Sequence, residues 1–151
     1  MPSIIISDTS CFIILAKIGE LDLLSKLYGQ VTTTSEVAAE YGDILPEWVN
    51  FQKVTDRAKQ QLLEMQLGVG ESSAIALALE MPGSTVLLDD YKARRIAAQL
   101  NLHYTGTIGI IIKAKLKDIV PSVKPLLEKI RQTNFRLSEE SEQQALKEAG
   151  E

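Results

Sequence analysis

Short apolar runs alternate along this chain with longer segments of helical periodicity, and acidic residues follow several of the runs. Asp8 follows the run 3–7, and Asp89 and Asp90 follow the run 85–88. Runs this short and rich in β-branched residues predict buried strands rather than helices. Strands that alternate with helices predict an α/β fold with a mainly parallel sheet.

Turn residues and apolar spacing set the expected order of elements. Strands are expected at 3–7, 30–33, 85–88 and 102–105, with an extended edge segment at 51–55 and a fifth strand at 134–137. Helices are expected at 8–18, 20–28, 34–41, 56–66, 71–80, 91–100, 106–116 and 121–132, with a charged helix or tail at 138–151. Thr33 and Glu36 have the spacing of a capping box, and Pro121 is placed near a helix start. No repeat or linker interrupts the chain, so 1–151 is expected to form one domain.

Composition narrows the class of protein. A hydrophobic content of 45% in 151 residues is enough for a substantial core. Only 5% of the residues are aromatic, which argues against a module that binds RNA mainly by stacking. The lone Cys11 predicts a buried thiol and a cytoplasmic protein. No positively charged start precedes the first apolar run, and no run is long enough for a membrane span, so neither a signal peptide nor a membrane segment is expected.

The acidic residues are expected to gather at one edge of the sheet. Ligands of open parallel sheets bind outside the carboxyl ends of the strands, where Asp8, Glu40, Glu71 and Asp90 are placed by this order of elements. Clustered carboxylates repel one another unless a cation lies between them, and hard divalent cations prefer oxygen ligands. This pattern predicts metal-assisted hydrolysis, most plausibly of a phosphodiester. The net charge of −4 is unusual for an enzyme that acts on nucleic acid, but without these four carboxylates the chain would be neutral. Cations bound between the carboxylates would make the charge of the site positive.

Several short motifs then suggest a family. They are Ile6-Ser7-Asp8-Thr9-Ser10, Val37-Ala38-Ala39-Glu40, Gly70-Glu71, Leu87-Leu88-Asp89-Asp90 and Thr105-Gly106-Thr107-Ile108-Gly109. In this order the chain resembles a PIN-domain nuclease, and more narrowly the short prokaryotic PIN proteins that include VapC-type toxins. One departure is Thr33 or Thr34, where the family often has a proline.

The resemblance implies a three-layer α/β/α sandwich, endoribonuclease activity, and a pocket that binds Mg²⁺ or Mn²⁺. It implies metal ligands at Asp8, Glu40, Glu71, Asp89 and Asp90, of which Asp90 is preferred to Asp89. RNA is the implied substrate, its products carry 5′-phosphate and 3′-hydroxyl ends, and a small antitoxin and a homodimer are the implied partners.

Each acidic residue also has an ordinary structural explanation. Asp8 can cap a helix, and Glu71 is favoured in any first helical turn. Glu36 is the rival candidate for the metal ligand on the same helix as Glu40. Its expected position in the capping box, however, gives Glu36 a structural function. Asp89 and Asp90 are adjacent on an extended segment, so their side chains are expected to point in opposite directions and to differ in role.

Candidate substrate contacts are less specific. They are Ser10, Thr105, Thr107, Lys92 and Arg94. The turn 105–107 before a helix can bind a phosphate with its amides or can be only a cap. Lysine and arginine residues on helices, including Arg95, Lys113, Lys115 and Lys117, either line an RNA path or are simply solvated.

Other classes fit less well. A receiver domain needs its acidic pair at the first strand, and a haloacid-dehalogenase-like phosphatase needs a second aspartate two residues after Asp8. No glycine-rich dinucleotide motif follows the first strand. The remaining alternative is a PIN-like module that binds nucleic acid or protein and cleaves little.

Overall fold

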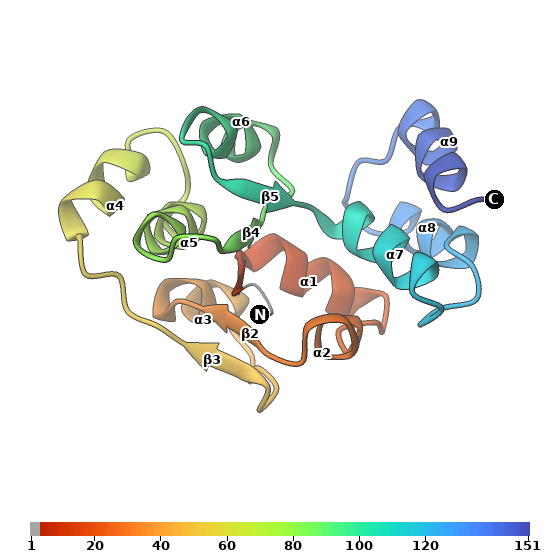
Figure 1. The fold of residues 1–151 in the computed structure, drawn as a ribbon, viewed down its shortest axis with the longest axis horizontal. Coiled ribbons are helices and arrows are strands. Elements are labelled where there is room, and N and C mark those ends of the chain that lie inside the picture. The colour runs from red at the N-terminus through yellow and green to blue at the C-terminus, as the bar shows by residue number, and fades with distance from the viewer. Residues whose placement is uncertain (1–3) are drawn as a thin grey trace.

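A computed structural model describes residues 4–151 and shows one parallel sheet between two layers of helices (Figure 1). The strands are β1 (Ile5–Ser7), β2 (Val31–Thr33), β3 (Val49–Phe51), β4 (Thr85–Leu87) and β5 (His103–Thr105). The helices are α1 (Thr9–Lys17), α2 (Leu23–Tyr28), α3 (Ser35–Tyr41), α4 (Arg57–Glu64), α5 (Val69–Glu80), α6 (Tyr91–Gln99), α7 (Thr107–Leu116), α8 (Lys124–Arg131) and α9 (Glu139–Glu148). The expected three-layer α/β/α fold is confirmed. The first predicted strand included Ser3, which lies outside the described residues.

The order of the strands is β3-β2-β1-β4-β5, and every neighbouring pair is parallel. The chain therefore builds outward from β1 in one direction and from β4 in the other. The amide of Asp8 donates to the carbonyl of Leu87 at 3.2 Å, which joins the carboxyl ends of these two central strands. The order of the strands reverses between β1 and β4, which makes this a topological switch point. At a switch point the two connections run to opposite faces of the sheet, and a crevice forms between them.

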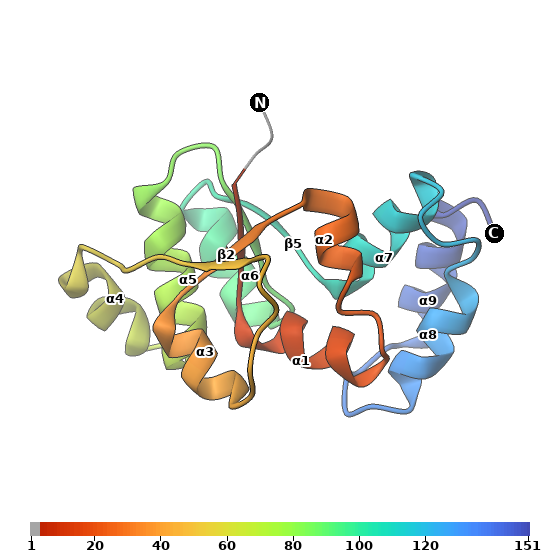
Figure 2. The same cartoon turned by 90° about the horizontal axis from the view of Figure 1, so that it is seen from below.

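Alternating side chains of the central strands supply two separate cores. Ile6, Val86 and Leu88 pack with α5 and α6 on one face of the sheet. Ile5 and Leu87 belong to the core on the other face, together with α1, α2, α7 and α8. The period of two along a strand explains this division, because successive side chains point to opposite faces. Figures 1 and 2 show α7, α8 and α9 gathered at one end of the molecule and α4 at the opposite end.

Three details of the sequence-based prediction are wrong. The segment 134–137 is an irregular link between α8 and α9, because Phe135 and Leu137 pack against helices rather than beside a strand. The edge strand expected at 51–55 is instead β3, and it begins earlier. The proline in the first turn of α8 is Pro125, not Pro121.

The helix cap near residue 34 also differs from the prediction. Thr34, not Thr33, accepts the hydrogen bond from the amide of Val37 at 3.1 Å and caps α3. Thr33 instead donates its hydroxyl to the carbonyl of Ser7 at 2.9 Å, which ties the end of β2 to β1. Among residues 4–151, no helix is long and apolar enough to cross a membrane.

Candidate metal centre at the carboxyl ends of the strands

Asp8 combines a structural role with a free carboxylate oxygen. Its side chain is fully buried, and Oδ1 accepts a hydrogen bond from the amide of Cys11 at 3.0 Å, which caps α1. The other oxygen, Oδ2, is buried and has no hydrogen-bond partner within the described chain. The cap fixes the orientation of the carboxylate, and it leaves one oxygen available for a ligand.

Neighbouring acids add to the cost of burying Asp8. Burial raises the pKa of Asp8 well above its ordinary value, and the negative charges of Asp89 and Glu71 raise it further. The backbone amides of Cys11 and Asp89 lower the pKa of Asp8. The Asp89 amide does so without forming a hydrogen bond to Oδ2. Asp8 is therefore held among other carboxylates in a site that favours its neutral form unless a cation is present.

Glu71 lies in the first turn of α5, as expected, but it is the third residue of the helix rather than its start. Its Oε1 accepts from the amide of Gly68 at 3.3 Å. Burial raises the pKa of Glu71, and the charges of Asp90 and then Glu40 raise it further. Glu71 is therefore near enough to feel the charge of the acid that follows β4 and of the acid on α3.

Asp89 and Asp90 serve different helices, in agreement with their adjacent positions on an extended segment. Asp90 caps α6, because its Oδ2 accepts from the amide of Ala93 at 2.9 Å. Asp89 accepts two hydrogen bonds from Thr107 at the start of α7, from the amide at 2.7 Å and from the hydroxyl at 2.6 Å. Burial raises the pKa of Asp89, while the bonds from Thr107 and the charge of Arg94 counteract that rise.

Glu40 reaches from α3 toward the helices that carry Asp8 and Glu71. Its Oε1 accepts from the hydroxyl of Thr9 at 2.6 Å. A Cβ atom at Gly70 would lie 2.0 Å from this same oxygen, so the absence of a side chain at residue 70 makes room for Glu40. The glycine before Glu71 thus allows α3 and α5 to bring two carboxylates close together.

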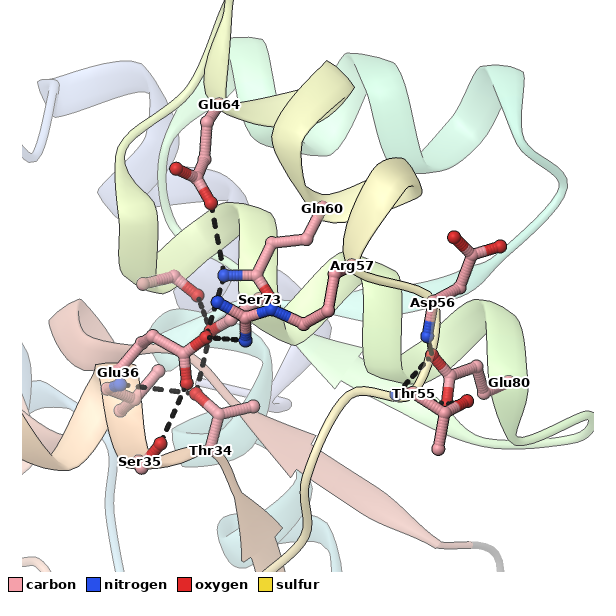
Figure 3. A network of polar contacts seen from close by, with 12 residues as sticks. Thr34, Ser35, Glu36, Thr55, Asp56, Arg57, Gln60, Glu64, Ser73 and Glu80 are labelled. Atoms are coloured by element: carbon pink, nitrogen blue, oxygen red, sulfur yellow. Dashed lines mark hydrogen bonds and ion pairs between the residues drawn. The ribbon is translucent and has the colours of Figure 1, made fainter.

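Glu36, the competing residue on α3, is used elsewhere. Figure 3 shows its carboxylate in a polar network with α4, where it accepts from Gln60 at 2.7 Å and pairs with Arg57 at 3.3 Å. Burial works to raise the pKa of Glu36, but hydrogen bonds from Gln60 and Ser35 outweigh it, so the pKa falls. Glu36 therefore joins α3 to α4 and is not free to act in the acidic site.

Helix N-termini converge on this site. Asp8, Glu71, Asp90 and Asp89 each interact with the first turn of a different helix, respectively α1, α5, α6 and α7. The positive ends of the helix dipoles partly offset the repulsion between the carboxylates. Within residues 4–151, no three His, Cys, Asp or Glu side chains are already arranged to hold one ion. Asp8, Glu71 and Asp90 each have one oxygen engaged by a helix, and Asp89 has both oxygens engaged. The buried and unpartnered Oδ2 of Asp8 is the feature that fits a cation.

An open cavity of about 570 Å³ lies over these acids. Ser10, Glu71, Asp89 and Asp90 line it, and we call it the acidic cavity. Asp8 does not line the cavity, because its side chain is fully buried. Lys17, Tyr91, Phe135 and Arg136 also line the cavity, so its wall includes cations and rings as well as acids.

The predicted substrate residues are divided between different places. Ser10 lines the acidic cavity, whereas Thr105 and Arg94 line a neighbouring one. Thr107 is fully buried, and both its amide and its hydroxyl are bound to Asp89, so neither donor is free for a phosphate. Lys92 is exposed and lines neither cavity. The turn 105–107 therefore anchors an aspartate rather than presenting these donors to an anion.

Three residues that line both cavities, namely Tyr91, Phe135 and Arg136, were not predicted as site residues from the sequence. Tyr91 follows Asp90 and has 77% of its surface exposed, and Arg136 lies in the link that was expected to be a strand. An exposed aromatic beside a strand-end acid was a usable indication for Tyr91. Nothing local to Arg136 indicated its position, because that depends on how α8 and α9 pack against α7.

Comparison with protein families agrees with this geometry. A family model described as a PIN domain matches residues 4–151, which is nearly the whole chain. Searches of curated proteins and of solved structures gave no match. The chain belongs to the PIN-domain family, whose members are generally nucleases.

Proposed function

We propose that this protein is an endoribonuclease that hydrolyses RNA phosphodiesters with Mg²⁺ or Mn²⁺. The observation that carries the proposal is the unpartnered, buried Oδ2 of Asp8 at the switch point between β1 and β4. A buried polar atom without a partner is costly, and more so when it belongs to an ionised carboxylate. A divalent cation bound there would supply the missing partner.

The chemistry of the surrounding donors suits a hard cation. The charges near Asp8 and Glu71 are carboxylates. Asp89 and Glu71 raise the pKa of Asp8, and Asp90 and Glu40 raise the pKa of Glu71. Oxygen donors of this kind match Mg²⁺ and Mn²⁺. Asp8, Glu71 and Asp90 would hold the ion, with Glu40 beside Glu71. Asp89 is assigned a positioning role, because Thr107 occupies both of its oxygens.

The chain's own residues have separable roles in this scheme. The Cys11 amide holds the Asp8 carboxylate in place, and the Asp89–Thr107 contact fixes the end of β4 against α7. Ser10 and Arg136 line the acidic cavity, where the Ser10 hydroxyl would contact a phosphate oxygen or a water and Arg136 would offer a positive charge to the substrate. When bound, a divalent ion lowers the pKa of water and neutralises charge on the phosphate. The products would carry 5′-phosphate and 3′-hydroxyl ends.

The test is cleavage of an end-labelled RNA in Mn²⁺, in Mg²⁺ and in excess EDTA. Wild type is compared with Asp8→Asn, which keeps the acceptor for the Cys11 amide, and with Asp118→Asn as a control for loss of an exposed charge. We expect metal-dependent cleavage by wild type and by the control, and none by Asp8→Asn. Full metal-dependent activity in Asp8→Asn would refute the proposal. The toxin role, the antitoxin and the homodimer implied by the resemblance stay predictions.

A further inference from the structure

A second cavity, of about 800 Å³, adjoins the acidic cavity between α6, β5, α7 and the α8–α9 link. We call it the arginine groove, because Arg94, Arg95 and Arg136 line it. We propose that the arginine groove binds a single-stranded nucleic acid beside the cleaved phosphate, with the Tyr91 ring stacked on an unpaired base. This inference rests on the proposed nuclease function and names the subsite that holds the substrate strand.

The two cavities are adjacent and share part of their walls. Four residues line both of them, namely Asp89, Tyr91, Phe135 and Arg136. A strand with one phosphate in the acidic cavity can therefore extend past these shared residues into the arginine groove. The α8–α9 link contributes Phe135 and Arg136, so the C-terminal helices complete a binding surface that the sheet and α6 begin.

The charges of the groove are placed for phosphates. Three arginines line it, against the carboxylates of Asp89 and Glu148, and Asp89 is already bound by Thr107. Among the described residues, none of these arginines takes part in an ion pair. The guanidinium of Arg94 lies over the Tyr104 ring, 5.2 Å from its centre, which holds the charge in a fixed position at the groove wall.

Other cations expected from the sequence have different partners. Lys113 lies over the Tyr28 ring, and Lys115 pairs with Glu151 at 3.6 Å. Neither lysine lines the arginine groove or the acidic cavity. Among the described residues, the arginine groove therefore has three cations outside any ion pair, and Lys17 on the wall of the acidic cavity adds a fourth, although the chain as a whole carries a net charge of −4.

The exposed aromatic residues favour a single-stranded nucleic acid over a duplex as the ligand of the arginine groove. Tyr91 has 77% of its surface exposed and Tyr104 has 37%, although aromatic residues make up only 5% of the chain. An exposed ring can stack on a base only when the face of that base is free, which is the case in single strands and loops but not inside a duplex. Two exposed tyrosines therefore lie at the arginine groove, where they can meet a base, whereas the exposed ring of Phe51 lies on β3 at the other edge of the sheet.

The test is binding measured by fluorescence anisotropy in EDTA, so that no metal-dependent cleavage interferes. The probes are labelled single-stranded RNA, single-stranded DNA and duplex RNA. The variants are Tyr91→Ala, Tyr91→Phe and Arg136→Gln. The matched controls are Phe51→Ala and Lys53→Gln, which remove an exposed ring and a charge beside β3, at the opposite edge of the sheet.

We expect wild type to bind single strands more tightly than duplex. Tyr91→Ala should weaken binding about tenfold, as loss of one stacked base does, while Tyr91→Phe should bind like wild type. Arg136→Gln should lower the slope of log affinity against log salt by about 0.7, the value for one phosphate contact in a single strand. Both controls should match wild type, and circular dichroism should show all variants folded.

The outcomes separate this inference from the proposed function. If single strands bind with this pattern but no metal supports cleavage, the nuclease proposal fails and the subsite stands. If wild type cleaves RNA but Tyr91→Ala and Arg136→Gln bind like wild type, the subsite is refuted and the nuclease stands. Equal affinity for duplex, or no binding to any of the three probes, would also refute the subsite.

Discussion

The carboxylate of Asp89 accepts both polar donors of Thr107, the amide at 2.7 Å and the hydroxyl at 2.6 Å. These residues lie eighteen positions apart and join the end of β4 to the start of α7. Gly106 permits this approach, because a Cβ atom there would lie 2.7 Å from Asp89 Oδ1. The motif Thr105-Gly106-Thr107 thus positions one acid of the site.

The hydroxyl of Thr107 is expected to contribute to stability. Thr107→Val leaves the shape of the side chain but removes one hydrogen bond to a half-buried carboxylate, so we expect a loss of about 1–2 kcal/mol in the free energy of unfolding. Urea denaturation measures it. Thr107→Ser keeps the hydroxyl and should retain most of the stability. A Val variant as stable as wild type would show that the contact is dispensable.

Gly70 is expected to matter through Glu40 rather than through the fold. A Cβ atom at residue 70 would lie 2.0 Å from Glu40 Oε1 and 2.7 Å from Thr9 Oγ1, so it would displace both groups and break the bond between them. The end of the exposed glutamate can move at little cost, and the buried Thr9 hydroxyl has to shift only a short way. Gly70→Ala should therefore stay folded, with a melting temperature near that of wild type, and lose cleavage activity about tenfold or more.

A double-mutant cycle tests whether Gly70 acts through Glu40. Glu40→Ala alone should also reduce cleavage, and Gly70→Ala should then add little further loss. If both losses add fully, the glycine acts by another route.

Asp8→Asn should stabilise the protein without metal while abolishing its activity. The folded-state pKa of Asp8 lies well above the ordinary value of 3.8, because of burial and then the charge of Asp89. Between these two pKa values the folded protein holds a proton that the unfolded chain has lost, so stability falls as pH rises. Above the folded-state pKa the cost is complete.

The comparison is of melting temperatures in EDTA across pH. Asp8→Asn should melt above wild type at pH 7.5, and the difference should shrink toward pH 4. Added Mn²⁺ should raise the melting temperature of wild type and leave that of Asp8→Asn nearly unchanged. A variant less stable than wild type at neutral pH in EDTA would show that the buried carboxylate is not destabilising.

Glu36 and Glu40 should give opposite results. Glu36→Ala removes an acceptor from the buried Gln60, which keeps a second bond to Glu64, so we expect a loss of about 1 kcal/mol and unchanged cleavage per folded molecule. Glu40→Ala should reduce cleavage with little effect on unfolding. Chemical denaturation and an RNA cleavage assay distinguish them, and reversed results would exchange their roles.

Local chemistry predicted much of the fold. Short runs rich in β-branched residues marked β1, β2 and β4, a short run between two helical segments marked β5, and Asp8 was recognised as a helix cap as well as a candidate ligand. These features depend on neighbouring residues alone, so a single sequence contains them. The parallel direction of the strands followed from the alternation of strands with helices.

The errors occurred where tertiary packing decides the outcome. The apolar alternation of Phe135 and Leu137 is typical of a strand, yet both residues pack against helices. Pro125, rather than Pro121, lies in the first turn of α8, and just before this helix the amide of Val123 donates to the Glu151 carboxylate at 2.7 Å. A contact 28 residues away has no local mark in the sequence.

The candidate site shows the same division. Strand-end position predicted the acids, but whether Asp89 or Asp90 bound a given helix required coordinates. The arginine groove could not be predicted, because Arg94 and Arg136 come from distant segments that meet only after α8 and α9 pack.

The central claim is that Asp8, Glu71 and Asp90 share a divalent cation. The most direct measurement is X-ray diffraction from crystals grown with Mn²⁺, using its anomalous scattering to locate the ion. We predict a peak within coordination distance of Asp8 Oδ2, with Glu71 and Asp90 turned toward it. A well-diffracting crystal in millimolar Mn²⁺ with no peak at Asp8, or with the ion bound elsewhere, would contradict the account.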